Sequence, residues 1–202
     1  MTTENLSREK TTVRVIIAST RPVRVGPQIA AEVVKIMEQN PRLNVQVTDL
    51  KELNLPFLDE PEMPSRGNYV HEHTKNWSGL IKASDAVVIV TCEYNWGYPA
   101  SLKNAIDYLY SEWRKKPILL VSYGAKGGPK ASEQLRQVLG RIRANVLETA
   151  IQIPLNDKED YGEDDLLHDA AAVVGAHAQD ITAALGELAS AAQEYVEAQT
   201  NA

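Results

Sequence analysis

The strongest constraint on the fold is an apolar run that ends in a polar, aromatic turn. Residues 86–90 read Ala-Val-Val-Ile-Val, residues 91–99 carry three aromatic side chains among polar neighbours, and residues 101–107 continue with helical character. A strand that is apolar on both faces is typical of the interior of a parallel sheet. The turn after it therefore lies at the carboxyl edge of the sheet, where open α/β folds bind their ligands.

The rest of the chain repeats this alternation of strand and helix. We predict strands at residues 13–18, 44–50, 86–91, 117–123 and 146–153, helices at 27–37, 77–84, 99–113 and 132–144, and an alanine-rich helix or helix pair from 164 onward. Prolines punctuate residues 53–76, which indicates a long surface connection. Five strands alternating with helices predict an α/β fold, a doubly wound five-stranded parallel sheet with helices on both faces.

Composition limits the classes of protein that remain. The 202 residues, 44% hydrophobic, suffice for one core without a compositional boundary, so we expect a loose leader over 1–12 and a single domain over 13–202. A net charge of −6 argues against nucleic-acid or anionic-lipid partners. One cysteine, no apolar stretch of roughly 20 residues and no apolar signal segment at the N-terminus together predict a cytoplasmic protein without membrane attachment.

The loop after the first predicted strand, residues 19–26, has the composition of an anion seat. It contains the Ser19 hydroxyl, the Arg21 and Arg24 guanidinium groups, and the Val25 and Gly26 amides at a helix start. It matches neither the G-x-x-x-x-G-K-[ST] nor the G-x-G-x-x-G spacing. A helix terminus contributes about 0.3 to 1 kcal/mol toward an anion, whereas a hydrogen bond to a charged group contributes about 1.5 to 3 kcal/mol. The arginines would therefore dominate; the alternative is that both are solvated charges in a tight turn.

The turn after residues 86–91 suits a planar heterocycle. Its candidate ligand contacts are Glu93, Tyr94, Asn95 and Trp96, and Tyr123 with Gly124 follows the neighbouring predicted strand. Aromatic side chains offer apolar faces, loop amides offer in-plane donors, and glycine allows close approach of the backbone. The alternative is that these residues only cap the next helix and cover the sheet end. Both loops together predict a phosphate-bearing aromatic ligand.

The same residues resemble the NADPH-dependent FMN reductases, a family that includes flavodoxin-like quinone and azo-compound reductases. The matching segments are 19–26, the Glu93-Tyr94-Asn95 run with Pro99 and residues 102–107, and residues 122–124. The resemblance implies a flavodoxin-like fold, bound FMN, reduction by NADPH or NADH, and homodimers or homotetramers. It assigns the FMN phosphate to the first loop and places the isoalloxazine ring between residues 93–96 and Tyr123 with Gly124.

The resemblance also implies the chemistry. Electrons would pass from NADPH through FMN to a small-molecule acceptor such as a quinone, azo compound, metal ion or free flavin, with no side chain as an obligatory acid or base. Glu93 is interpreted as a helix or loop anchor. Two other classes stay open at this point: a non-enzymatic electron carrier that binds FMN, and a redox-sensing interaction protein that acts through its C-terminal helices.

Two positions depart from the family pattern, which commonly has Gly where Ala18 stands and Pro where Cys92 stands. Replacing proline frees an amide and relaxes the turn. Cys92 itself is interpreted as a small buried apolar residue rather than as a redox group.

Three further pairs of residues each support a prediction. His71 and His73 lack a further ligand nearby, so we expect no metal site. Trp77 and Trp113 are expected to pack between subunits, because large aromatic side chains are favoured at interfaces. Lys103 and Asp107 are four residues apart on a predicted helix, a spacing that permits an ion pair.

Overall fold

The computed structural model describes residues 10–156 and 158–201, and most of the predicted leader lies outside them. Five strands form one parallel sheet in the order β2-β1-β3-β4-β5. Their bounds are Thr11–Ile17 (β1), Leu43–Asp49 (β2), Ala86–Cys92 (β3), Pro117–Gly124 (β4) and Asn145–Pro154 (β5). This is the strand order of flavodoxin-like folds, so the predicted architecture is confirmed.

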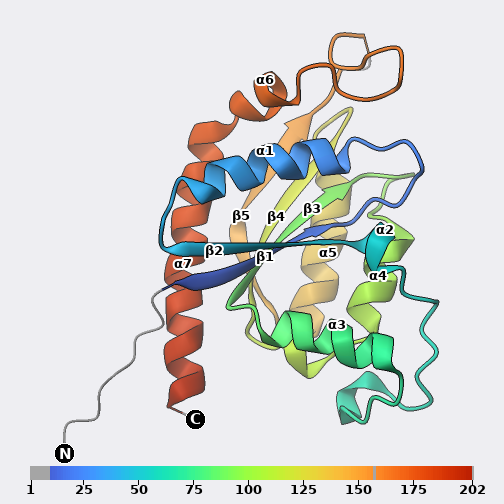
Figure 1. Ribbon diagram of the computed structural model, residues 1–202, viewed down its shortest axis with the longest axis vertical. Coiled ribbons are helices and arrows are strands. Elements are labelled where there is room, and N and C mark those ends of the chain that lie inside the picture. The colour runs from blue at the N-terminus through green and yellow to red at the C-terminus, as the bar shows by residue number, and fades with distance from the viewer. Residues whose placement is uncertain (1–9, 157, 202) are drawn as a thin grey trace, which may run out of the picture.

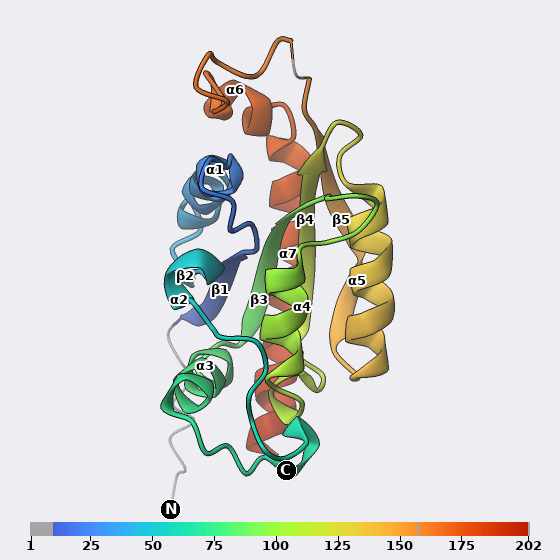
Figure 2. The ribbon, with the colours of Figure 1, turned by 90° about the vertical axis from the view of Figure 1, so that its right-hand side faces the viewer.

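Helices cover both faces of this sheet. The main ones are α1 (Gly26–Glu38), α3 (Glu72–Lys82), α4 (Ala100–Asp107), α5 (Pro129–Arg141), α6 (Ala170–Gly175) and α7 (Ala178–Thr200), with short turns α2 (Leu50–Leu53), η1 (Pro64–Arg66) and η2 (Ser111–Trp113). Figure 1 shows α1 and the long α7 beside the sheet, and Figure 2 shows the strands between α4 in front and α7 behind. None of the helices in the described ranges has the length and apolarity that a membrane span requires.

The two faces of the sheet form two separate cores, because successive side chains of a strand point to opposite sides. In β3, Val88 and Val90 pack toward α1 and α7, whereas Val87 and Ile89 pack toward α3, α4 and α5. Every residue of β3 is buried. The uniform apolar run at residues 86–90 is therefore explained by a strand in the middle of three layers.

The start of α3 was missed from the sequence. We expected the helix to begin at residue 77, but it begins at Glu72. Its buried face carries Thr74 and Ser78 beside Trp77 and Ile81, so two of the four core positions are polar. The apolar periodicity that predicts a helix is hidden for that reason.

The predicted helix 99–113 is also shorter in the structure. Here α4 ends at Asp107, and a separate 3₁₀ turn, Ser111–Trp113, follows. Tyr110, between them, has φ −136° and ψ −62°, outside the helical region. The buried carboxylate of Glu112 accepts hydrogen bonds from Tyr110 N (3.3 Å) and Ser111 Oγ (3.1 Å), which stabilises the break.

The placement of Trp77 and Trp113 corrects another expectation. Both indoles are completely buried inside this chain, with ring centroids 6.1 Å apart at 63°. Trp77 Nε1 donates to Ala105 O (2.8 Å) and Trp113 Nε1 donates to Ile106 O (3.1 Å). They tie α3 and η2 to α4 and are not available to an interface between subunits. By contrast, the predicted Lys103–Asp107 ion pair is present on α4.

Candidate functional site

Three loops meet at the carboxyl edge of the sheet, after β1, β3 and β4. Ser101 Oγ, at the start of α4, donates to Ala18 O (2.7 Å), and Glu93 N donates to Tyr123 O (3.2 Å). The chain leaves β1 toward β2 on one side and later returns to β3 on the other. The boundary between β1 and β3 is therefore the topological switch point, where a ligand crevice is expected.

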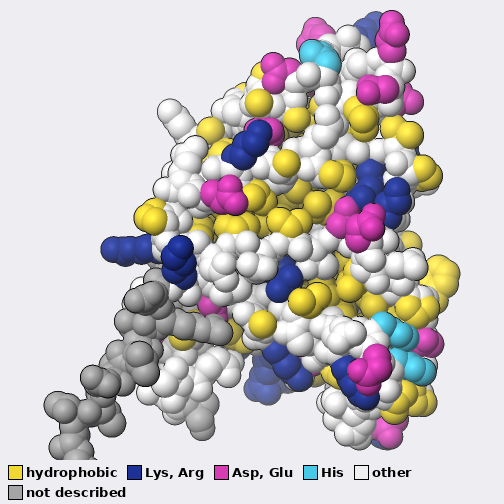
Figure 3. All heavy atoms as spheres, viewed as in Figure 1, with side chains coloured by type: hydrophobic (Ala, Val, Ile, Leu, Met, Phe, Trp, Pro, Cys, Tyr) yellow, Lys and Arg dark blue, Asp and Glu magenta, His cyan; other side chains and the backbone are white. Residues whose placement is uncertain are grey.

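Arg24 in the first loop is held by an acidic residue from another strand. Its Nη1 donates to Asp49 Oδ1 (2.8 Å) and to Ser19 O (2.6 Å), and its Nη2 donates to Asp49 Oδ2 (2.5 Å). Basic and acidic side chains adjoin at the right-hand edge of Figure 3, where α2 and the start of α1 lie in Figure 1. A fork-to-fork pair of this kind fixes the loop geometry. Arg24 thus fixes the shape of the first loop through bonds to Asp49 and to the Ser19 carbonyl.

Arg21 is placed differently from Arg24. Its side chain is exposed, and within the described residues no carboxylate forms an ion pair with it. The loop therefore offers one arginine that is locked and one whose donors are open to an incoming anion.

The start of α1 forms a close-packed cradle around buried hydroxyl groups. Ser19 is 1% exposed, and its Oγ has no hydrogen-bond partner of acceptable geometry within the described chain, although the Tyr123 hydroxyl lies beside it. A Cβ at Gly26 would stand 2.3 Å from Ser19 Oγ and 2.7 Å from Tyr123 Oη. No side chain caps the N-terminus of α1 and no acidic residue lies in its first turn. An orphaned hydroxyl beside an uncapped helix start is suited to an anion.

The second loop is a tight two-residue turn. Tyr94 N donates to Gly97 O (2.8 Å) and Gly97 N donates to Tyr94 O (3.0 Å), with Asn95 and Trp96 at the tip. Both tip residues have positive φ, 47° and 74°. The turn projects the Trp96 indole, 66% exposed, from the sheet edge.

Glu93 anchors this loop to α5, as expected from the sequence. Its Oε2 accepts hydrogen bonds from Lys130 N (2.9 Å) and Ala131 N (3.3 Å), in the first turn of that helix. The N-cap of α5 is Gly128, which has no side chain to satisfy those amides. A carboxylate at a helix N-terminus is favoured by both hydrogen bonding and the helix dipole.

Three ionisable groups at the ends of β3 and β4, those of Cys92, Tyr94 and Tyr123, have raised pKa values. Burial raises the pKa of the Cys92 thiol, and burial together with the neighbouring Cys92 raises the pKa of Tyr123 and of Tyr94. A buried thiol with a raised pKa is a poor nucleophile. The interpretation of Cys92 as a buried small residue is confirmed, since it is 4% exposed at the end of β3.

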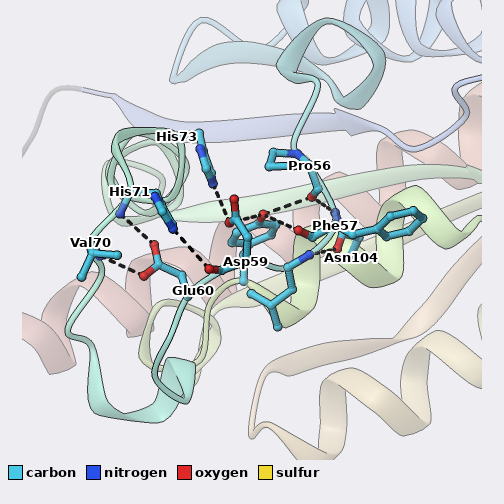
Figure 4. Close-up of polar contacts among 10 residues, drawn as sticks. Pro56, Phe57, Asp59, Glu60, Val70, His71, His73 and Asn104 are labelled. Atoms are coloured by element: carbon cyan, nitrogen blue, oxygen red, sulfur yellow. Dashed lines mark hydrogen bonds and ion pairs between the residues drawn. The ribbon is translucent and has the colours of Figure 1, made fainter.

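The two histidines predicted to lie in the long connection stand at the start of α3, His71 as its N-cap and His73 in its first turn, on a polar network of their own (Figure 4). His73 Nε2 lies 3.0 Å from Asp59 Oδ1, and His71 Nε2 lies 3.2 Å from Asp59 O. The Glu60 carboxylate accepts from Val70 N (2.9 Å) and His71 N (3.1 Å). Over residues 10–156 and 158–201 no His, Cys, Asp or Glu cluster has the geometry of a metal site. These contacts order the connection.

Comparison with known proteins identifies the family. The family model for NADPH-dependent FMN reductases matches residues 11–156. The chain belongs to this family. An NAD(P)H-dependent FMN reductase of Saccharomyces cerevisiae is 42% identical over 155 residues, 71% of this chain and 81% of that protein. A quinone reductase of Escherichia coli is 30% identical over 147 residues, 69% of this chain and 74% of that protein.

Solved structures agree with the fold of this FMN reductase family member. The flavoenzyme FerB of Paracoccus denitrificans, an NAD(P)H:(acceptor) oxidoreductase, superposes with a TM-score of 0.70 at 22% identity, covering 92% of this chain and 98% of that one. At this identity the likeness shows the flavodoxin-like fold alone. Family membership makes the protein an FMN-dependent NAD(P)H oxidoreductase, so the implied cofactor, reductant and enzyme class are confirmed and the carrier and sensor alternatives are not favoured.

The residues present fit FMN at both of its ends. The phosphate end needs donors, and the first loop has the orphaned Ser19 hydroxyl, the open Arg21 and the uncapped start of α1. The ring end needs flat apolar walls with backbone donors, and the Tyr94–Gly97 turn stands beside the end of β4. Gly124, with φ +148°, lies there as well, and that backbone conformation is rarely adopted by other residues.

Three residues of the candidate site were not predicted from the sequence. Asp49 holds Arg24, while Lys130 and Gln134 hold Trp96 through a cation–π contact at 5.5 Å and a 2.8 Å hydrogen bond from Nε2 to the Trp96 carbonyl. Asp49 stands at the carboxyl end of β2, and the same position at a strand end was the signal that pointed to the two loops. Lys130 and Gln134 lie on a helix, where nothing in the local pattern distinguishes them from solvated residues.

Proposed function

We propose that this protein oxidises NADPH or NADH and passes the electrons through FMN to a small-molecule acceptor, a quinone, an azo compound, a metal ion or free flavin. One observation supports this most: the loop with the buried, unpaired Ser19 hydroxyl and the aromatic turn follow β1 and β3, the two neighbouring strands at the switch point. Quinone and azo reductases occur among the relatives. When bound, FMN would supply the redox chemistry, hydride acceptance from a nicotinamide and electron delivery to an acceptor.

The first loop would hold the phosphate end of the cofactor. Arg21 and the Ser19 hydroxyl supply donors, together with the amides of Val25 and Gly26 at the start of α1. Arg24 would contribute indirectly, because its bonds to Asp49 and to the Ser19 carbonyl hold the loop in the conformation that presents these donors. A contact from Arg24 to the phosphate, predicted from the sequence, would use the guanidinium donors left over from these bonds.

The second loop and the end of β4 would flank the ring. Tyr94, Asn95 and Trp96 form one side, and Tyr123 with Gly124 forms the other. Glu93 supports this turn by accepting a hydrogen bond from Lys130 N at the start of α5. Burial raises the pKa of the Tyr94 and Tyr123 hydroxyls above the ordinary tyrosine value, so both are uncharged at neutral pH. In this proposal the side chains orient the cofactor, and none is assigned as an obligatory acid or base.

The proposal also covers domain organisation, oligomeric state and cellular location. We propose one domain over residues 13–202, a homodimer or homotetramer, and a cytoplasmic location. The net charge of −6 supports a protein without nucleic-acid or membrane partners.

The decisive experiment is the visible spectrum of the purified protein, recorded anaerobically before and after one equivalent of NADPH. Flavin bands that bleach on addition support the proposal, and bleaching by NADH is measured in parallel. Steady-state oxidation of NADPH with a quinone separates an enzyme from a carrier. A protein that binds FMN but leaves it oxidised in excess NADPH and NADH would contradict the proposal.

Site occupancy is tested by FMN titration of the Arg21→Ala and Arg24→Ala variants. We expect weaker retention in both, because a lost hydrogen bond to a charged group costs about 1.5 to 3 kcal/mol. Lys35→Ala is the control, since that lysine belongs to an exposed pair with Glu32 on α1. Unchanged occupancy in the arginine variants would place the phosphate elsewhere.

A further inference from the structure

The exposed turn beside the FMN site stores backbone strain. Trp96 has φ +74°, in the left-handed region that a bulky residue rarely adopts. Two-residue turns with positive φ at both positions favour Asn-Gly, and the sequence here is Asn95-Trp96. Strain of this kind persists where the surrounding structure enforces it, and it clusters at functional positions.

Helix α5 enforces this conformation. Gln134 Nε2 donates to the Trp96 carbonyl (2.8 Å), and Gly97 packs so closely that a Cβ there would lie 2.9 Å from Gln134 Oε1. Glu93 binds the first-turn amides of the same helix. The backbone of Trp96 is thus held in place while the residue stays 66% exposed.

A cation accompanies the exposed ring. Lys130 Nζ lies 5.5 Å from the centroid of the Trp96 ring and 2.8 Å from Glu133 Oε2. Both partners of that ion pair are partly open, with side-chain exposures of 37% and 56%. An ammonium group has three donors, so the pair with Glu133 leaves donors for a ligand lying on the indole.

We propose that Trp96 and Lys130 form a platform that selects flat aromatic electron acceptors carrying an anionic substituent, a carboxylate or a sulfonate. The indole supplies the stacking face and the Lys130 ammonium supplies the counter-charge at its edge. Glu133 competes with the ligand for that ammonium. This inference rests on the proposed function, because it names the class of acceptor that the same site prefers.

The other charges near the turn are compatible with an anion. The Glu93 carboxylate is bonded to the α5 amides, where the helix N-terminus offsets its charge. Arg21 and Arg24 belong to the opposite, first loop. Glu133 is therefore the acidic group in direct contact with the Lys130 ammonium.

The test uses two probes of equal shape that FMN cannot reduce, naphthalene-2-sulfonate and naphthalene-2-sulfonamide. Their dissociation constants are measured by calorimetry on the oxidised holoprotein without any nicotinamide. Wild type is expected to prefer the sulfonate by about fivefold, the size of an exposed charge contact. Lys130→Gln should abolish that preference, whereas Glu133→Gln should strengthen sulfonate binding about twofold.

Two further variants control for folding and for general charge. Trp96→Gly restores the residue that the turn prefers, so the fold should be retained. Its FMN content is brought to that of wild type before titration, and binding of both probes to this FMN-loaded variant should fall at least fivefold. Lys75→Gln removes a lysine from an equivalent pair, 2.8 Å from Glu72 on α3, and should leave both constants unchanged.

Equal binding of the two probes by wild type, or a sulfonate preference that survives in Lys130→Gln, would overturn the proposal. Full probe binding by Trp96→Gly would do the same. These results are read from probe affinity, whereas failure of the proposed function would appear in flavin content and bleaching by NADPH.

Discussion

The guanidinium of Arg24 and the carboxylate of Asp49 form two side-by-side hydrogen bonds, of 2.8 and 2.5 Å, between the first loop and the end of β2. The Arg24 side chain is only 9% exposed in this pair. Asp49 also accepts from Lys51 N (2.9 Å), so its carboxylate caps α2 as well. One acidic residue therefore sets the position of both the first loop and the turn after β2.

We predict that Asp49→Ala weakens FMN binding about tenfold, because a charge-assisted bidentate pair that orders the loop is lost. Asp49→Asn should have a smaller effect, since its carbonyl oxygen still accepts one bond. Affinity is measured by quenching of FMN fluorescence on titration into apoprotein. Glu32→Ala, which breaks an exposed pair on α1, is the control. Unaltered affinity in Asp49→Ala would show that the loop is ordered without the pair.

Gly26→Ala is predicted to destabilise the protein by about 1 to 3 kcal/mol, the usual cost of overpacking. The added methyl would overlap Ser19 Oγ and Tyr123 Oη at 2.3 and 2.7 Å. Gly186→Ala is the matched control, because nothing lies within 4 Å of its Cβ position in α7. That change should stabilise by about 0.5 to 1 kcal/mol. Urea unfolding measures both, and a neutral Gly26→Ala would refute the close-packed cradle.

Removal of the Glu93 carboxylate is expected to weaken the start of α5. Glu93→Ala should cost about 0.5 to 2 kcal/mol, as other lost N-terminal caps do. Glu93→Gln keeps an acceptor oxygen for the amides of Lys130 and Ala131, so its cost should be smaller. Chemical unfolding monitored by circular dichroism gives the two values. If the two variants were equally stable, the cap would not depend on a hydrogen bond.

Glu112 is predicted to make the fold acid-sensitive. Burial raises the pKa of this carboxyl, but hydrogen bonds from Ser78 Oγ (2.6 Å) and Tyr69 Oη (3.0 Å) lower the pKa by more than burial raises it. The folded pKa therefore lies below its ordinary value of 4.5. A carboxyl with a depressed folded pKa stabilises the fold above its unfolded pKa. That contribution is lost as the pH falls from about 4.5 through the folded pKa.

The measurement is the unfolding free energy of wild type and Glu112→Gln between pH 3 and 7. Glu112→Gln should be less stable at pH 7, and the difference should narrow toward pH 3. A difference that stays constant across this range would rule out Glu112 as a source of the acid sensitivity.

The local sequence pattern was enough to predict those parts of the fold that depend on residues close together in the chain. The apolar runs of β3 and β4 predicted a parallel sheet, because strands buried on both faces leave no polar alternation. The hydroxyl and arginine loop and the Glu93-Tyr94-Asn95 turn could be found because residues after a buried strand must lie at the sheet edge. The same reasoning failed at α3, where Thr74 and Ser78 occupy core positions.

The sequence by itself determined the layered architecture and the edge at which the site forms. Only the tertiary structure decided which side chains pair there: Asp49 with Arg24, Lys130 and Gln134 with Trp96, and Trp77 with Trp113 in the core instead of at an interface. The physical reason is that hydrophobic period and turn chemistry act over a few residues. A salt bridge, a cation–π contact or a buried aromatic pair joins segments that come together only when the strands take their order in the sheet.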